Sequence, residues 1–222
     1  MRDVVSISRI EADALISEHH YLAKIGARFK SGTNFGLLED GQLVGACVFT
    51  GFPVAELFKS IWGVDDFRGF DQSGFYELSR LVLHPLVQHR SGIHADCTAS
   101  WFVSRCLRKM KAAGAKAVLS YADSDYHNGT VYAASNFKYY GKTAPKFNIW
   151  IPDSNGVYLP QEKRPGRPET HWRQMSRGWR VHLDNGGIKV PRGVKHRFLR
   201  VCCKRVKAWP ILWQEERWRN AQ

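Results

Sequence analysis

The sequence lacks the features that mark membrane, secreted and repetitive proteins. No run in its 222 residues approaches the roughly 20 consecutive apolar residues that a membrane-spanning helix needs. The first residues, Met1-Arg2-Asp3, do not begin a secretory signal peptide, and there is no internal repeat or low-complexity tract. These absences predict a cytoplasmic protein without a membrane partner, built as one substantial core or as one domain plus an extension.

Cysteine is sparse and carries no metal-binding pattern. The chain has five cysteines, none of them in a CxxC pair: Cys47, Cys97, Cys106, Cys202 and Cys203. An odd number of cysteines without metal spacing is typical of reduced, packed thiols in a cytosol. The spacing therefore argues against a zinc site.

Acidic residues are scarce at the C-terminal end. Residues 161–222 hold 16 of the 33 Lys and Arg residues but 5 of the 20 Asp and Glu residues, so they carry +11 of the net charge of +13. Five tryptophans lie among these cations: Trp172, Trp179, Trp209, Trp213 and Trp218. Cations bind phosphates and aromatic rings stack on bases, so the pattern favours a nucleic-acid partner; the alternative is a solvated basic surface around core tryptophans. Because periodicity also fades beyond Pro152, we expect a catalytic domain over 1–152 and a basic, Trp-rich, DNA-binding extension over 153–222 that packs on it.

The segment from Tyr76 to Phe137 organises the predicted fold. Apolar runs typical of strands alternate there with apolar repeats at three and four residues, typical of helices: strand 76–83, helix 99–110, strand 117–122 and helix 130–135. Strand, helix, strand, helix in this order predicts adjacent parallel strands with a ligand at their carboxyl ends.

Local signals predict further elements on either side. The capping box Ser8-Arg9-Ile10-Glu11 predicts a helix that carries Ile10, Leu15 and Ile16 inward. Asp40-Gly41 between apolar runs predicts a hairpin over 35–49. We also expect a strand over 147–151 that pairs near Leu119, and a short strand over 198–203.

The order of these elements, with Tyr132-x-x-x-Asn136-Phe137, resembles the GCN5-related acetyltransferase (GNAT) fold. The resemblance implies fold class α/β (α+β): a mixed central sheet flanked by helices, followed here by the basic extension. It also implies acetyl-CoA or a related acyl-CoA as donor, whose pyrophosphate is held by backbone N–H groups at a helix N-terminus. The cofactor-binding residues implied are Leu81, Leu83, His89, Arg90, Ser91 and Gly92. In this loop Gly92 is the one position that follows the family's Gln/Arg-x-x-Gly-x-Gly/Ala pattern.

A narrower resemblance covers most of the chain. The motifs that carry it look like those of the Mom proteins of Mu-like phages: His19-His20-Tyr21-Leu22, Glu77-Leu78-Ser79-Arg80-Leu81, Ser120-Tyr121-Ala122-Asp123 and Asn128-Gly129-x-x-Tyr132-x-Ala134-x-Asn136-Phe137. Those GNAT-related enzymes place a carbamoylmethyl group on the exocyclic amine of adenine in phage DNA and so shield it from restriction. The resemblance implies double-stranded DNA and an acyl-CoA-like donor as partners, in the cytoplasm of a bacterial host.

Three residues take the central roles that this resemblance implies. Arg80 would bind a phosphate or acyl oxygen; the alternative is a structural ion pair with Glu77 or Asp123, since an unpaired buried charge is costly. Asp123, after a strand, would orient the adenine amine or accept its proton; the alternative is a helix cap. Tyr132 would act as general acid towards a leaving thiolate; the alternative is a core tyrosine.

Further candidates are weaker. His20 and Tyr21 would close the site from the first helix, Ser104 (and Ser100) would face the cofactor, and His127 lies in the loop before Tyr132. The family has been suspected of using iron, for which His19, His20, Asp123 and Tyr132 would be ligands, but no spacing requires a metal.

Two other functions compete with DNA adenine modification. One is an ordinary GNAT N-acetyltransferase that acts on a protein or a small amine, against which the basic tail and the unusual loop count. The other is a non-catalytic nucleic-acid-binding protein on a GNAT scaffold.

Overall fold

A computed structural model describes residues 1–21, 32–53, 55–65, 71–88, 98–143, 146–152, 154–160, 183 and 186–207. The chain forms two compact units, one of residues 1–142 with 195–222 and one of residues 143–194. The Trp-rich part of the predicted extension and the loop at His89–Gly92 lie outside the described residues. None of the described helices is both long and apolar enough to cross a membrane.

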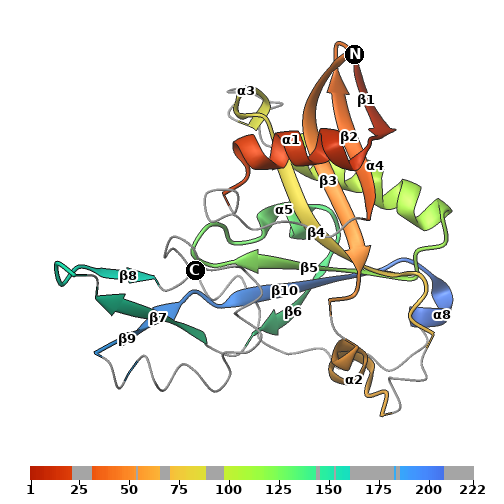
Figure 1. The fold of residues 1–222 in the computed structure, drawn as a ribbon. Coiled ribbons are helices and arrows are strands. Elements are labelled where there is room, and N and C mark those ends of the chain that lie inside the picture. Colours follow the sequence, from red (N-terminus) through yellow and green to blue (C-terminus); the bar gives the residue numbers. More distant parts are fainter. Residues whose placement is uncertain are drawn as a thin grey trace. The chain divides into compact units, whose positions relative to one another are not determined.

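A seven-stranded sheet forms the centre of the first unit (Figure 1). Its strands, in spatial order, are β1 (Arg2–Ser6), β2 (Thr33–Glu39), β3 (Gln42–Gly51), β4 (Phe75–Leu83), β5 (Ala117–Asp123), β10 (Lys195–Val201) and β6 (Lys138–Lys142). The β4–β5 pair is parallel, and the other neighbouring pairs are antiparallel. The predicted mixed sheet, the hairpin at Asp40-Gly41 and the parallel pair are therefore confirmed.

Helices cover both faces of this sheet. They are α1 (Arg9–His19), α2 (Glu56–Trp62), α3 (Pro85–Gln88), α4 (Thr98–Ala112), α5 (Thr130–Ala134) and α8 (Lys204–Lys207). Figure 1 shows α1 crossing in front of β2, β3 and β4, with α4 behind them. Correspondingly, Val82 of β4 belongs to the core cluster under α1, and Leu83 to the cluster under α4.

The N-terminal helix begins as the sequence predicts. The Ser8 side chain accepts a hydrogen bond from the Glu11 backbone N–H, and the Glu11 carboxylate accepts one from the Ser8 backbone N–H. Leu15 and Ile16 are buried as predicted. The inward placement of Ile10 was wrong: its side chain is 82 % exposed. Position 10 lies in the first turn, and the inward stripe begins at Ala12.

The strand over 147–151 exists, but its predicted pairing near Leu119 was wrong. As β7 (Lys146–Pro152) it pairs with β8 (Tyr158–Pro160) and β9 (Ile188–Arg192) in a three-stranded sheet of the second unit. Leu119 pairs instead with Leu199 of β10. A strand inside the central sheet must be apolar on both faces, and Phe198 and Leu199 are both fully buried.

Strand β10 confirms the predicted short strand near 198–203 and has a consequence for domain organisation. The predicted division into 1–152 and 153–222 rests on composition, whereas the compact units rest on contacts. By contacts, a strand from the basic extension belongs to the central sheet and separates β5 from β6.

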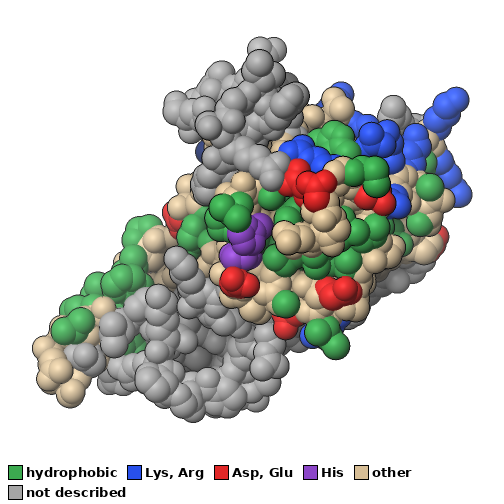
Figure 2. Space-filling view, turned by 90° about the horizontal axis from the view of Figure 1, so that it is seen from above, with side chains coloured by type: hydrophobic (Ala, Val, Ile, Leu, Met, Phe, Trp, Pro, Cys, Tyr) green, Lys and Arg blue, Asp and Glu red, His purple; other side chains and the backbone are tan. Residues whose placement is uncertain are grey.

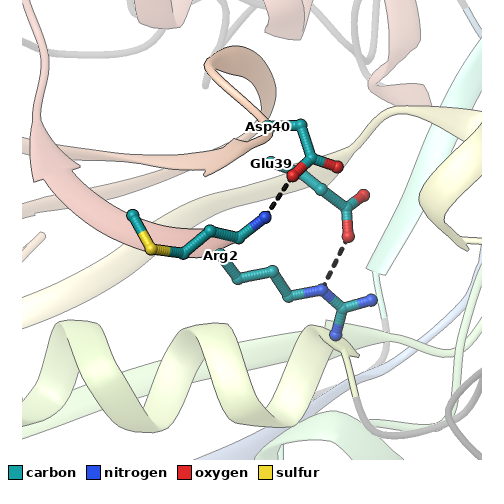
Figure 3. A network of polar contacts seen from close by, with 4 residues as sticks. Arg2, Glu39 and Asp40 are labelled. Carbon is teal, nitrogen blue, oxygen red and sulfur yellow. Dashed lines mark hydrogen bonds and ion pairs between the residues drawn. The ribbon is translucent and has the colours of Figure 1, made fainter.

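At the β1 edge of the sheet, polar contacts link β1 to the end of β2 and to the β2–β3 turn (Figure 3). Arg2 Nε donates to Glu39 Oε1 at 2.8 Å, and the N-terminal ammonium pairs with Asp40. Charged groups along an edge strand discourage pairing with another chain.

Candidate functional site

The site begins where β4 and β5 stop pairing. These strands are hydrogen-bonded only from Phe75 to Leu78 and from Ala117 to Ser120, although both continue for several residues. At the last paired position the buried Ser120 hydroxyl donates to the Leu78 carbonyl oxygen at 3.0 Å. Beyond this point lies a cavity of about 540 Å³, lined by the separated ends of both strands, the end of α1 and the 126–132 segment.

A β-bulge in β4 marks the same point. Phe49 of β3 pairs with Leu78 and the preceding Val48 pairs with Arg80, so Ser79 is an extra residue. Leu78 and Arg80 therefore do not share a face of the strand, as they would if β4 alternated regularly. Leu78 packs in the cluster under α4. Arg80 lies two residues before Val82, which packs under α1, so the side chains of Arg80 and Val82 are on the same face of the strand. The bulge thus places Arg80 on the side of the sheet where α1 ends.

Tyr132 lies at the base of the cavity and is 5 % exposed. Its ring packs against Phe137 and Phe198 at centroid distances of 5.7 and 5.5 Å. Burial raises the pKa of the phenol, which a hydrogen bond with the Ser120 side chain opposes. The phenol is therefore protonated near neutral pH. It lies beside Ser120, whose hydrogen bond to Leu78 marks the point where β4 and β5 stop pairing. Both a packing role and a proton-donating role are compatible with this position.

Asp123 ends β5 at the cavity wall and is 7 % exposed. Its carboxylate accepts a hydrogen bond from the Asp125 backbone N–H at 3.3 Å, and its carbonyl oxygen accepts bonds from the backbone N–H groups of Tyr126 and His127. In the sheet register Lys195 of β10 lies opposite Asp123. A carboxylate and an ammonium side chain therefore come from adjacent strand ends to one wall of the cavity.

Arg80 and His20 form the polar part of the wall near the end of α1. Burial lowers the pKa of Arg80, and the nearby Glu77 carboxylate raises it; Nη1 donates to the Ser79 carbonyl oxygen at 2.7 Å. Burial, together with the charges of Arg80 and His127, lowers the pKa of His20 to about 4. The His20 ring is consequently neutral near pH 7, and Arg80 is the fixed positive charge beside it.

Aromatic rings complete the wall. The Tyr21 ring stacks on His20 and on Tyr126, and burial and Asp123 raise the pKa of Tyr21. The His127 ring meets Tyr132 edge-on at 6.0 Å, and burial lowers the pKa of His127. Titratable groups whose pKa values are shifted by burial, gathered around one cavity, are typical of an active site.

Most of the predicted site residues meet at this cavity. The ones that line it are His20, Tyr21, Arg80, Leu81, Leu83, Asp123, His127 and Tyr132. Ser104 lies on α4 and is not among the lining residues, and His89, Arg90, Ser91 and Gly92 lie outside the described part of the chain.

Sequence reasoning missed other lining residues, among them Glu77, Tyr121, Tyr126 and Lys195. Glu77 and Tyr121 could have been predicted, because Glu77 belongs to the sequence motif around Arg80 and Tyr121 to the motif that ends at Asp123. Lys195 had no local signal, because a strand pairing 72 residues away in sequence brings it there.

The described residues include a group of exposed cations but no cluster of metal-ligating side chains. No group of three or more His, Cys, Asp or Glu residues in that part of the chain could hold a metal ion. Figure 2 shows a face on which histidines lie beside hydrophobic and acidic side chains, while Lys and Arg side chains gather at one end. Helix α4 contributes four exposed cations: Arg105, Arg108, Lys109 and Lys111.

Comparison with known proteins gives one family and several similar structures. The model of the Mom protein family matches residues 2–216. No curated protein sequence matches the chain. The chain is similar to the ribosomal-protein-S18-alanine N-acetyltransferase from Escherichia coli, with 9% identity, coverage of 91% of this chain and 94% of that one, and a TM-score of 0.47. It is also similar to an N-acetyltransferase from Staphylococcus aureus (10% identity, 91% and 99% coverage, TM-score 0.48). A GNAT family N-acetyltransferase from Escherichia coli in complex with CoA matches with 17% identity, 62% and 68% coverage and a TM-score of 0.40.

Proposed function

The chain belongs to the Mom protein family, and on this premise we propose that it modifies DNA, converting adenine to carbamoylmethyl-adenine with an acyl-CoA-like donor. The family match, which spans nearly the whole chain, is the observation that carries the proposal. The biological role that follows is protection of phage DNA from restriction in the cytoplasm of a bacterial host.

The cavity supports this proposal through the groups that surround it. Tyr132 offers a protonated phenol near the point where β4 and β5 stop pairing, and Asp123 offers a carboxylate on the cavity wall. Arg80 supplies a fixed positive charge for a phosphate or acyl oxygen. Leu81 and Leu83 lie in the part of β4 that no longer pairs with β5, and we propose that an elongated donor binds along this part of the strand.

The protein groups have definite tasks in an acyl transfer. In an ordinary acyl transfer the exocyclic amine of adenine would attack the thioester carbonyl, an N–C bond would form and the C–S bond would break, which gives an N-acyl adenine and a free thiol. Asp123 accepts the proton that the amine loses, and Tyr132 protonates the departing thiolate. A carbamoylmethyl product instead carries its new N–C bond at a methylene carbon next to a carboxamide, so acyl transfer alone does not form it, and an acetyl product of acetyl-CoA would differ from it in mass.

Access to the base requires DNA binding. An adenine in a duplex must leave the base stack before it can enter a cavity, at a cost of about a few kcal/mol. We propose that the basic extension over 153–222 offsets this cost through phosphate contacts, with Lys195 as the point where the extension reaches the cavity.

Mass spectrometry of nucleosides tests the proposal. Plasmid DNA from cells that express the protein should contain a deoxyadenosine species heavier by a carbamoylmethyl group, and DNA from cells that express Asp123→Asn should contain about 100-fold less of it, or still less. An acetyl increment would keep the enzyme but correct the reaction. Unmodified DNA from cells with soluble protein would contradict the proposal, and acetylation of a cellular protein in the same cells would favour an N-acetyltransferase.

A further inference from the structure

Three aromatic rings form a column at the wall of the cavity. The His20 and Tyr21 rings have centroids 4.4 Å apart and planes inclined by 26°. The Tyr21 and Tyr126 rings have centroids 4.1 Å apart and planes inclined by 25°. Two near-parallel rings at about 4 Å cannot occupy the same face of a third ring, so His20 and Tyr126 cover opposite faces of Tyr21.

Exposure increases along this column. His20 at the inner end is 7 % exposed, and Tyr126 at the outer end is 53 % exposed. Tyr21 is the ring that Tyr126 contacts within the described part of the chain, and this contact covers one face of Tyr126. The column therefore ends in an aromatic face that is open to a further flat group.

The position of the open face is fixed relative to the reacting groups. Tyr126 lies in the turn after β5, where its backbone N–H donates to the Asp123 carbonyl oxygen at 2.9 Å. All three rings of the column line the same cavity as Asp123, Arg80 and Tyr132. A planar group stacked on Tyr126 would consequently lie at the entrance to the cavity and beside its catalytic groups.

We infer that Tyr126 is a stacking residue for a nucleobase extruded from DNA, and that it holds this base at the entrance of the cavity. This inference rests on the proposed function. Every nucleobase presents a π-face, and stacking on an aromatic side chain offsets part of the stacking energy that the base loses when it leaves the duplex. The His20–Tyr21 pair beneath would keep the Tyr126 ring in place.

Binding of short single strands separates base stacking from phosphate contacts. The full chain and its variants would be titrated against a fluorescent oligodeoxyadenylate and against a strand of equal length made of abasic sites. Tyr126→Leu should weaken binding of the adenine strand on the order of 10-fold and leave binding of the abasic strand unchanged. Tyr126→Phe keeps the ring and is the matched control, so it should bind both strands like the unaltered protein.

Other outcomes would overturn the inference. Equal loss on both strands would assign Tyr126 to phosphate binding or to folding, and no loss on either strand would remove it from recognition. Weaker binding of free coenzyme A by Tyr126→Leu, with adenine-strand binding intact, would assign the ring to the donor. The proposed function fails separately: unmodified plasmid DNA would contradict DNA modification even if Tyr126 stacks on bases, and modified DNA with no effect of Tyr126→Leu on binding would contradict the stacking alone.

Discussion

Replacing Tyr132 with phenylalanine should abolish most of the modification without unfolding the protein. The change removes one hydroxyl group and keeps the ring, whose contacts with Phe137 and Phe198 hold it in the core. If the phenol protonates the leaving group, its loss removes a general acid, a contribution of about 100-fold to 10,000-fold in rate. The substitution also removes the hydrogen bond between the Tyr132 hydroxyl and Ser120, which should lower the free energy of unfolding by only about 1 kcal/mol.

A second buried tyrosine provides a matched control. Tyr140 is 1 % exposed, and its hydroxyl donates to the Ser60 carbonyl oxygen at 2.5 Å, outside the set of residues that line the cavity. Tyr140→Phe should therefore cost a similar amount of stability, since it also loses one buried hydrogen bond, and should leave the modification rate unchanged.

The assay combines two measurements on the three proteins. Nucleoside mass spectrometry after timed expression gives the rate of appearance of the modified base, and urea denaturation gives the free energy of unfolding. Modification by Tyr132→Phe at nearly the original rate would refute proton donation by Tyr132. Equal loss of modification in both variants would show that the effect comes from stability.

Three further predictions follow from charge. Acid should destabilise the protein through His20, whose pKa falls from 6.5 in the unfolded chain to about 4 in the folded protein. The folded state favours the neutral ring, so His20 does not reduce the free energy of unfolding above pH 6.5. As the pH falls towards 4, the free energy of unfolding should decrease by about 3 kcal/mol. Urea denaturation across this range should show the loss, and His20→Gln should reduce it; identical curves would contradict the assignment. Asp123→Asn keeps the side-chain size, so modification should fall about 100-fold or more while DNA affinity, measured by fluorescence anisotropy, is retained; an unchanged rate would remove Asp123 from the mechanism. The logarithm of DNA affinity should fall linearly with the logarithm of salt concentration if residues 153–222 bind phosphates, and a flat dependence would contradict that role.

Local signals in the sequence predicted much of the central unit. The Ser8–Glu11 capping box, the Asp40-Gly41 turn and the alternating apolar periods of residues 76–135 each depend on neighbours within a few positions, and each corresponds to an element of the structure. The same elements carry Arg80, Asp123 and Tyr132, which explains why motifs on them already indicated the residues of one cavity.

Features that depend on distant partners could not be predicted in the same way. The bulge at Ser79 is a mismatch between β4 and β3, and β4 alone reads as regular alternation. The place of β10 beside β5 depends on pairing between segments far apart in sequence, and the sequence alone does not show that β7 pairs elsewhere, with β8 and β9. Lys195 and the Tyr21–Tyr126 stack arise only after these tertiary choices have been made.

The insertion of β10 between β5 and β6 also bears on how the protein is made. The ribosome delivers β5 and β6 well before β10, so the edges of β5 and β6 that β10 joins stay unpaired until residues 195–201 have been synthesised. Such edges favour association with other chains, and we expect the emerging protein to need protection at this stage. Translation that stops before residue 195 would leave the sheet open and one wall of the cavity without Lys195. Completion of the central sheet is thereby tied to translation beyond residue 201.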